Sequence, residues 1–148
     1  MLATALPKLL FHTAAVPPSW PDVSGTDWAQ PFITAVGSLL PGTAPGSPFR
    51  PDQVLTRQEA AAWTVQAFGW APLPAAAATA FLGTYPDGAA TAQIDAGLFA
   101  AAVNLGLVVG DAGTGDLQPG APIDRAEAAV LVLRAMQMAP AVAAPAAG

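Results

Sequence analysis

Two stretches of the chain place apolar side chains at helical spacing, three and four positions apart. The first stretch begins at Thr56 and the second at Asp124. Their apolar positions are Ala60, Trp63 and Ala67 in the first stretch, and Ala128, Leu131 and Ala135 in the second. This spacing is typical of a helix that buries one face. It predicts a helix in each stretch and assigns Trp63 to the core.

A further helix is predicted ahead of each of these two. Asp27 can cap a helix that runs to about Leu39, with Pro31 tolerated in its first turn. Its counterpart is expected over about residues 91–105, and one more helix over residues 2–12. The chain is therefore predicted to be mainly α-helical.

The same order of motifs occurs twice along the chain. The segment from Phe49-Arg50-Pro51 to Thr56-Arg57-Gln58-Glu59 is echoed by Leu117-Gln118-Pro119 to Asp124-Arg125-Ala126-Glu127, an offset of 68 residues (125 − 57). Upstream, Trp20-Pro21-Asp22 is echoed by Tyr85-Pro86-Asp87 at an offset of 65 (87 − 22). We therefore expect two related units, copy one and copy two.

These motifs divide the chain into five segments. Copy one is expected over residues 19–70 and copy two over residues 85–138, with a Pro/Ala-rich linker at residues 71–84. An N-terminal helical segment at residues 1–18 precedes them, and a Pro/Ala tail at residues 139–148, expected to be mobile, follows.

Composition narrows the classes of partner. Charged residues make up 10% of the chain, far fewer than in an ordinary domain, which favours a surface partly covered by other subunits or by a larger polypeptide. The net charge of -5 provides no positive field for a nucleic acid backbone.

The most apolar stretch, Gly97 to Gly110, is too short to cross a bilayer, so we expect no membrane span. Residues 1–18 lack the basic cluster of a cleavable export signal, so either that signal is missing here or export takes another route.

The doubled motif resembles the S-layer homology family. Copy one carries Pro21-Asp22-Val23, Trp28-Ala29, Gly42, Phe49-Arg50-Pro51 and Thr56-Arg57-Gln58-Glu59; copy two carries Tyr85-Pro86-Asp87, Gly106, Gly110-Asp111, Leu117-Gln118-Pro119 and Asp124-Arg125-Ala126-Glu127. Gln58 and Asp124 depart from the family's Thr-Arg-Ala-Glu signature. The resemblance implies tandem helix-loop-helix repeats, packed as a small pseudo-symmetric helical bundle with long loops. It also implies binding of a pyruvylated secondary cell-wall polysaccharide.

The four-residue signature has a structural role at each helix start. Thr56 with Glu59, and Asp124 with Glu127, are expected to form capping boxes. By contrast, a cation at the first helical position gains nothing from the helix dipole, so Arg57 and Arg125 should each have an anionic partner. That partner is either a carboxylate of the neighbouring copy, such as Asp22 or Asp87, or an external carboxylate such as a pyruvyl ketal.

Other candidate glycan-binding residues lie near the Pro-Asp turns. Trp20 and Tyr85 could stack on sugar rings or simply pack, and Arg50 is the next candidate cation. Asp22 and Asp87 also count among the candidate glycan-binding residues, although their equivalent turn positions favour a shared structural duty over a glycosidase pair.

The sequence offers no support for an enzyme, a metal or a cofactor. His12 is the only histidine and cysteine is absent, which leaves no triad and no multi-histidine or thiolate metal site. The segment from Asp111 to Asp116 is interpreted as a glycine-rich turn, because it lacks the ordered ligands of a calcium loop.

Two functions remain open at this point. The first is a non-catalytic module, at the cell wall or cell surface, that anchors a protein through an anionic polysaccharide. The second is a structural subunit of a surface assembly, filament or virus particle, whose partners are other copies of itself or a larger surface or virion protein.

Overall fold

The computed structural model describes residues 20–37, 40 and 43–138, and this part of the chain is mainly α-helical, as predicted. Its elements in chain order are α2 (Gln30–Val36), α3 (Arg57–Ala67), α4 (Ala75–Leu82), the 3-10 helices η2 (Gly88–Ala90) and η3 (Gln93–Asp95), α5 (Ala96–Asn104) and α6 (Arg125–Met138). The helix predicted over residues 2–12, the N-terminal segment and the Pro/Ala tail lie outside the described residues. Within those residues no helix combines the length and the apolar character needed to cross a membrane.

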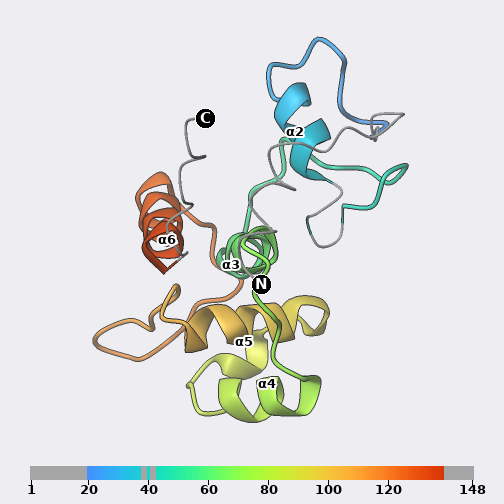
Figure 1. Cartoon of the computed structure of the whole chain (residues 1–148). Coiled ribbons are helices and arrows are strands. Elements are labelled where there is room, and N and C mark those ends of the chain that lie inside the picture. Colours follow the sequence, from blue (N-terminus) through green and yellow to red (C-terminus); the bar gives the residue numbers. More distant parts are fainter. Residues whose placement is uncertain (1–19, 38–39, 41–42, 139–148) are drawn as a thin grey trace, which may run out of the picture.

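The centre of the fold is the contact between α3 and α5. Alanines occupy most of the facing positions, with Ala61 and Ala62 of α3 and Ala100 and Ala102 of α5 all fully buried. Because these side chains are small, the two helices can approach closely and bury their backbones well. Phe99 of α5 is the largest fully buried side chain beside them. Figure 1 shows α3 running between α6 on one side and α5 on the other.

Helix α4 lies in the segment that the sequence suggested as a linker. Its alanine run favours a helix after Pro74, and Ala78 and Leu82 are buried against α5. The connection is tied further by a hydrogen bond from the Leu73 N–H to the Gly97 carbonyl, 3.0 Å long. One face of α4, carrying Ala78 and Leu82, therefore belongs to the core.

Helix α2 begins later than expected. Asp27 does not cap it, because the N-cap position is Ala29, and the Asp27 carboxylate instead accepts a hydrogen bond of 2.8 Å from the Ala29 N–H. Pro31 lies in the first turn, as predicted. Trp20 packs near the end of this helix, where it is only 4% exposed and donates from its indole nitrogen to the Thr43 carbonyl at 3.1 Å.

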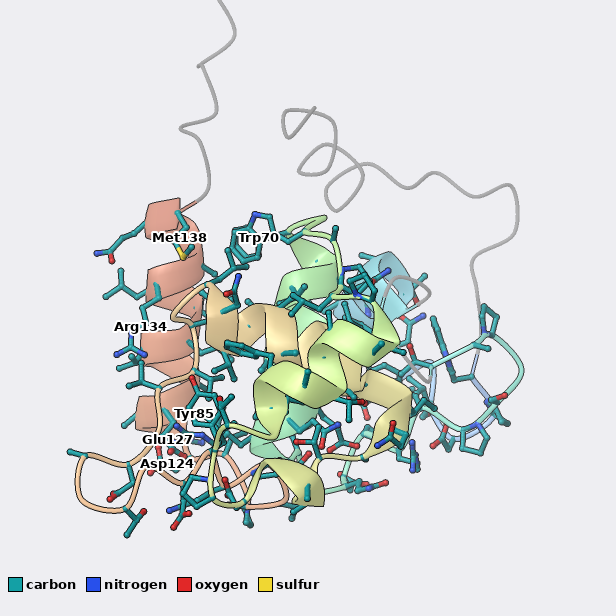
Figure 2. The ribbon with its side chains drawn as sticks, turned by 90° about the horizontal axis from the view of Figure 1, so that it is seen from below. Trp70, Tyr85, Asp124, Glu127, Arg134 and Met138 are labelled. Atoms are coloured by element: carbon teal, nitrogen blue, oxygen red, sulfur yellow. The ribbon has the colours of Figure 1, made fainter. Side chains whose placement is uncertain are left out.

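Helix α6 packs through a narrow face. Only Leu131 and Ala135 are buried, whereas large apolar side chains elsewhere on the helix are exposed: Val130, Val132, Leu133, Met136 and Met138. Figure 2 shows the helix at one edge of the molecule, from Asp124 at its start to Met138 at its end. An apolar groove of about 430 Å³ extends from Phe32 across Trp63 of α3 to Val132 of α6. One side of the molecule therefore retains an uncovered apolar surface.

Candidate functional site

Asp22 and Asp87 hold two loops in the same way. The Asp22 carboxylate accepts from the N–H groups of Phe49 and Arg50, at 2.8 and 2.6 Å. The Asp87 carboxylate accepts from the N–H groups of Leu117 and Gln118, also at 2.8 and 2.6 Å. Desolvation raises the pKa of Asp22, but the backbone N–H donors outweigh it and hold that pKa below its usual value. Both aspartates therefore organise the chain around them.

The second residue that each aspartate binds, Arg50 or Gln118, has a left-handed backbone conformation. Arg50 and Gln118 adopt φ values of 61° and 53°, and both precede a proline. A non-glycine residue in this left-handed region is uncommon and needs support from its surroundings. The two hydrogen bonds that each aspartate accepts provide that support.

Capping boxes start α3 and α6. Thr56 accepts from the Glu59 N–H at 3.2 Å, and Glu59 accepts from the Thr56 N–H at 2.9 Å. Asp124 accepts from the Glu127 N–H at 2.8 Å, while Glu127 accepts from the Asp124 N–H at 3.2 Å. Figure 2 shows Asp124 and Glu127 together at the start of α6. These four side chains satisfy helix-end donors that would otherwise lack partners.

Arg57 pairs with a carboxylate that the sequence did not single out for it. Its guanidinium forms an ion pair with Glu127 and donates at 2.8 Å to the Val109 carbonyl. Glu127 lies in copy two, so the partner is a carboxylate of the neighbouring copy, as expected. The suggested residues Asp22 and Asp87 are wrong for Arg57, because their oxygens accept backbone N–H groups. The Arg57 Nε is buried and has no hydrogen-bond partner among the described residues. Arg57 thus connects α3 to the start of α6 and keeps one donor unused.

Gln58 makes a second connection that sequence reasoning missed. Its amide donates to the Ala92 carbonyl at 2.8 Å and accepts from the Ala92 N–H at 2.9 Å. The side chain is 5% exposed, so water cannot easily replace these bonds. The departure of Gln58 from the family signature was the available clue, since glutamine can satisfy both backbone groups and alanine neither.

We expect Gln58→Ala to lower the free energy of unfolding by about 1–3 kcal/mol, because it removes both hydrogen bonds between the buried Gln58 amide and the Ala92 backbone. Urea unfolding followed by circular dichroism measures this change. Gln66→Ala, at an exposed position of the same helix, is the control and should change stability by less than about 0.5 kcal/mol. Equal effects of the two substitutions would contradict a special role for Gln58.

The remaining candidate residues occupy different environments. Arg125 and Arg50 are exposed, and Arg125 has no hydrogen bond or ion pair within the described ranges. Tyr85 is half-buried against Phe81, with ring centroids 5.8 Å apart. Trp20 is buried, so its ring faces are covered by protein. Among the predicted cations, Arg125 and Arg50 are therefore the ones open to an external anion.

A groove beside Arg57 adds one cation that sequence reasoning missed. It has a volume of about 300 Å³ and is lined by Arg57, its ion-pair partner Glu127, Arg134, and apolar side chains that include Val109, Ile123 and Val130. Arg134 donates to the Leu107 carbonyl at 3.1 Å and lies on the outer side of α6 in Figure 2. An anionic group with an apolar substituent matches this lining. Arg134 lies beyond both motifs, so nothing in the sequence pattern marked it.

The segment from Asp111 to Asp116 is a self-contained turn. Asp111 accepts from the N–H groups of Thr114 and Gly113, and these bonds lower the pKa of Asp111. Across residues 20–37 and 43–138, no group of three or more metal-ligating side chains comes together. His12 lies outside the described residues.

Comparison with protein families identifies an S-layer homology domain at residues 84–129. This range runs from the turn of Asp87 into the first turns of α6, and it includes Asp124, Arg125 and Glu127. S-layer homology domains are non-catalytic modules that anchor proteins to cell-wall polymers, and their presence implies association with the cell surface. Searches of curated proteins and of solved structures produced no significant match.

Proposed function

From the S-layer homology domain at residues 84–129, we propose that this chain is a non-catalytic module that anchors a protein to the cell envelope by binding a pyruvylated secondary cell-wall polysaccharide. The domain match carries the proposal. Arg125 supplies a cation for the carboxylate of the polysaccharide, because it is exposed at the start of α6.

We also propose that residues 19–70 form a second repeat of the same kind. The equivalent hydrogen bonds of Asp22 and Asp87 support this, as does the left-handed backbone of both Arg50 and Gln118. The turns that contain the two aspartates also match. The Val23 N–H donates to the Trp20 carbonyl and the Gly88 N–H to the Tyr85 carbonyl, each at 3.2 Å. These matched contacts support a similar local fold in the two segments.

Within this arrangement, the groove beside Arg57 is the proposed binding site. Arg134 can meet a carboxylate there, since it pairs with no carboxylate among the described residues, whereas Arg57 is already paired with Glu127 in the same groove. The apolar lining suits the methyl group of a pyruvyl ketal. Arg125 is the second proposed contact, and Arg50 and Tyr85 provide further polar and aromatic surface. Trp20 is left with a packing role, because it is buried.

The test is titration of purified pyruvylated polysaccharide into the wild-type chain and Arg125→Ala, followed by calorimetry. We expect binding by the wild type and about 10- to 100-fold weaker binding by the variant, the loss that follows from removing one charge-assisted contact. Because Arg125 is exposed, the variant should fold normally, which circular dichroism checks.

Two controls sharpen this experiment. Gln66→Ala, exposed on α3, should bind like the wild type. Polysaccharide from which the pyruvyl groups have been removed should bind weakly to every variant. Equal binding of the two polysaccharides would exclude the pyruvyl carboxylate as the recognised group, and no binding by the wild type would overturn the proposal.

A further inference from the structure

Backbone hydrogen bonds connect the start of α3 to the segment before α6. The Arg57 N–H donates to the Ala121 carbonyl at 2.8 Å, and the Gln58 N–H to the Pro119 carbonyl at 3.0 Å. In the opposite direction, the Ile123 N–H donates to the Leu55 carbonyl at 3.0 Å. Together with the ion pair of Arg57, these bonds join the two proposed repeats.

The equivalent backbone donors and acceptors lie 68 residues away along the chain, but there they have no hydrogen-bond partner among the described residues. The donors corresponding to Arg57 and Gln58 are the N–H groups of Arg125 and Ala126, and neither has a partner in the described part of the chain. The acceptors corresponding to Ala121 and Pro119 are the carbonyls of Gln53 and Pro51, which are equally unpaired among the described residues. The molecule thus carries a donor edge at the start of α6 and an acceptor edge before α3.

The charges on these two edges are complementary. The donor edge carries the exposed guanidinium of Arg125. The acceptor edge carries Glu59, the counterpart of the Glu127 that receives Arg57. Asp95 lies beside Glu59 in the same small cavity, where burial, and then the charge of Glu59, raise the pKa of Asp95. Arg50 also lines this cavity, but no ion pair joins it to either carboxylate within the described ranges.

The acceptor edge also exposes apolar surface. Val54 is 65% exposed and Ile94 is 82% exposed, and both line the cavity that contains Glu59 and Asp95. Large apolar side chains grouped with unpaired polar groups are characteristic of a protein–protein contact.

We propose that a second copy of this chain docks its donor edge, centred on Arg125, onto the acceptor edge of the first, centred on Glu59 and Val54. The contact repeats the one between Arg57 and Glu127 inside each chain. Since the two edges differ, the association is head to tail, and each added copy presents a new free edge. This inference depends on the second repeat proposed above, because that repeat supplies the equivalence between the edges.

Two variants test the two edges separately by sedimentation velocity over a range of protein concentrations. Arg125→Glu reverses the charge of the donor edge, and Val54→Lys places a bulky cation on the acceptor edge. The wild type should form species larger than a monomer as concentration rises, and each variant should associate more than about tenfold less tightly. Gln137→Glu, an added negative charge at an exposed position near the end of α6, should behave like the wild type.

Arg125→Glu should not unfold α6, since a negative charge is favourable at a helix N-terminus. A mixture of Arg125→Glu and Val54→Lys chains provides the decisive result. Each variant retains one intact edge, so the mixture should form a dimer and nothing larger. A wild type that stays monomeric, or variants that associate as well as the wild type, would overturn the proposal.

Polysaccharide binding separates this inference from the proposed anchoring function. Val54→Lys leaves every arginine in place, so it should lose self-association and still bind the polysaccharide. If Val54→Lys lost polysaccharide binding but still self-associated, the acceptor edge would belong to the glycan site and the head-to-tail contact would be wrong.

Discussion

Replacing Asp87 with alanine is expected to lower the free energy of unfolding by about 2–4 kcal/mol, from the loss of two charge-assisted hydrogen bonds at a half-buried position. The carboxylate now receives the N–H groups of Leu117 and Gln118. Without it, the left-handed conformation of Gln118 loses its support, and the fully buried Leu117 is no longer held in the core. Chemical denaturation followed by tryptophan fluorescence measures the change.

Asp22→Ala is the matched comparison. The same two bonds are lost, but Asp22 is exposed and the residue it holds, Phe49, is only partly buried. We therefore expect a smaller effect than for Asp87→Ala. An Asp22 variant that loses as much stability as the Asp87 variant would mean that burial does not set the strength of these bonds.

The residues that act locally could be identified from the sequence. Each capping box lies within four residues, so its spacing alone specifies the contact. The helical spacing of apolar positions likewise predicted α3 and α6, because helix periodicity is a local property. Trp63, which the spacing assigned to the core, is instead half-buried: it packs against Phe49 and lines the uncovered apolar groove.

Contacts between distant segments could not be predicted in the same way. Glu127 was assigned to its own helix cap, and nothing in its neighbourhood marked it as the partner of Arg57, 70 residues away. The bond between Gln58 and Ala92 joins a side chain to backbone groups, which carry no sequence signature. Helix α4 was missed because an alanine run has no apolar periodicity to read.

Two findings describe different properties of the chain: the family match over residues 84–129, and the equivalent hydrogen bonds of Asp22 and Asp87. The first identifies the class of domain. The second concerns geometry, since aspartates 65 positions apart (87 − 22) each receive two consecutive backbone N–H groups. The groove beside Arg57 and the edge at Val54 are lined by different residues, whereas Arg125 is shared by the proposed glycan contact and the proposed donor edge. A single Arg125 therefore serves one of these two partners at a time.

Gly88→Ala is expected to lower the free energy of unfolding by about 3 kcal/mol or more, or to prevent folding. A Cβ at this position would lie 1.8 Å from the Leu82 carbonyl oxygen and 2.6 Å from its carbon. Both are backbone atoms at the end of α4, so no side-chain rotation relieves the clash. The turn of Asp87 and the end of α4 would have to separate, which disturbs the packing of buried Leu82.

This requirement also explains a difference between the two proposed repeats. Val23 occupies the position that corresponds to Gly88 (88 − 65 = 23), and it is half-buried with no such clash to avoid. Gly120→Ala is the control, because the Cβ that it adds would have no atom within 4 Å, and it should change stability by less than about 1 kcal/mol. Thermal unfolding of the two variants beside the wild type measures the difference. If Gly88→Ala unfolded like Gly120→Ala, the close approach of α4 to the Asp87 turn would be wrong.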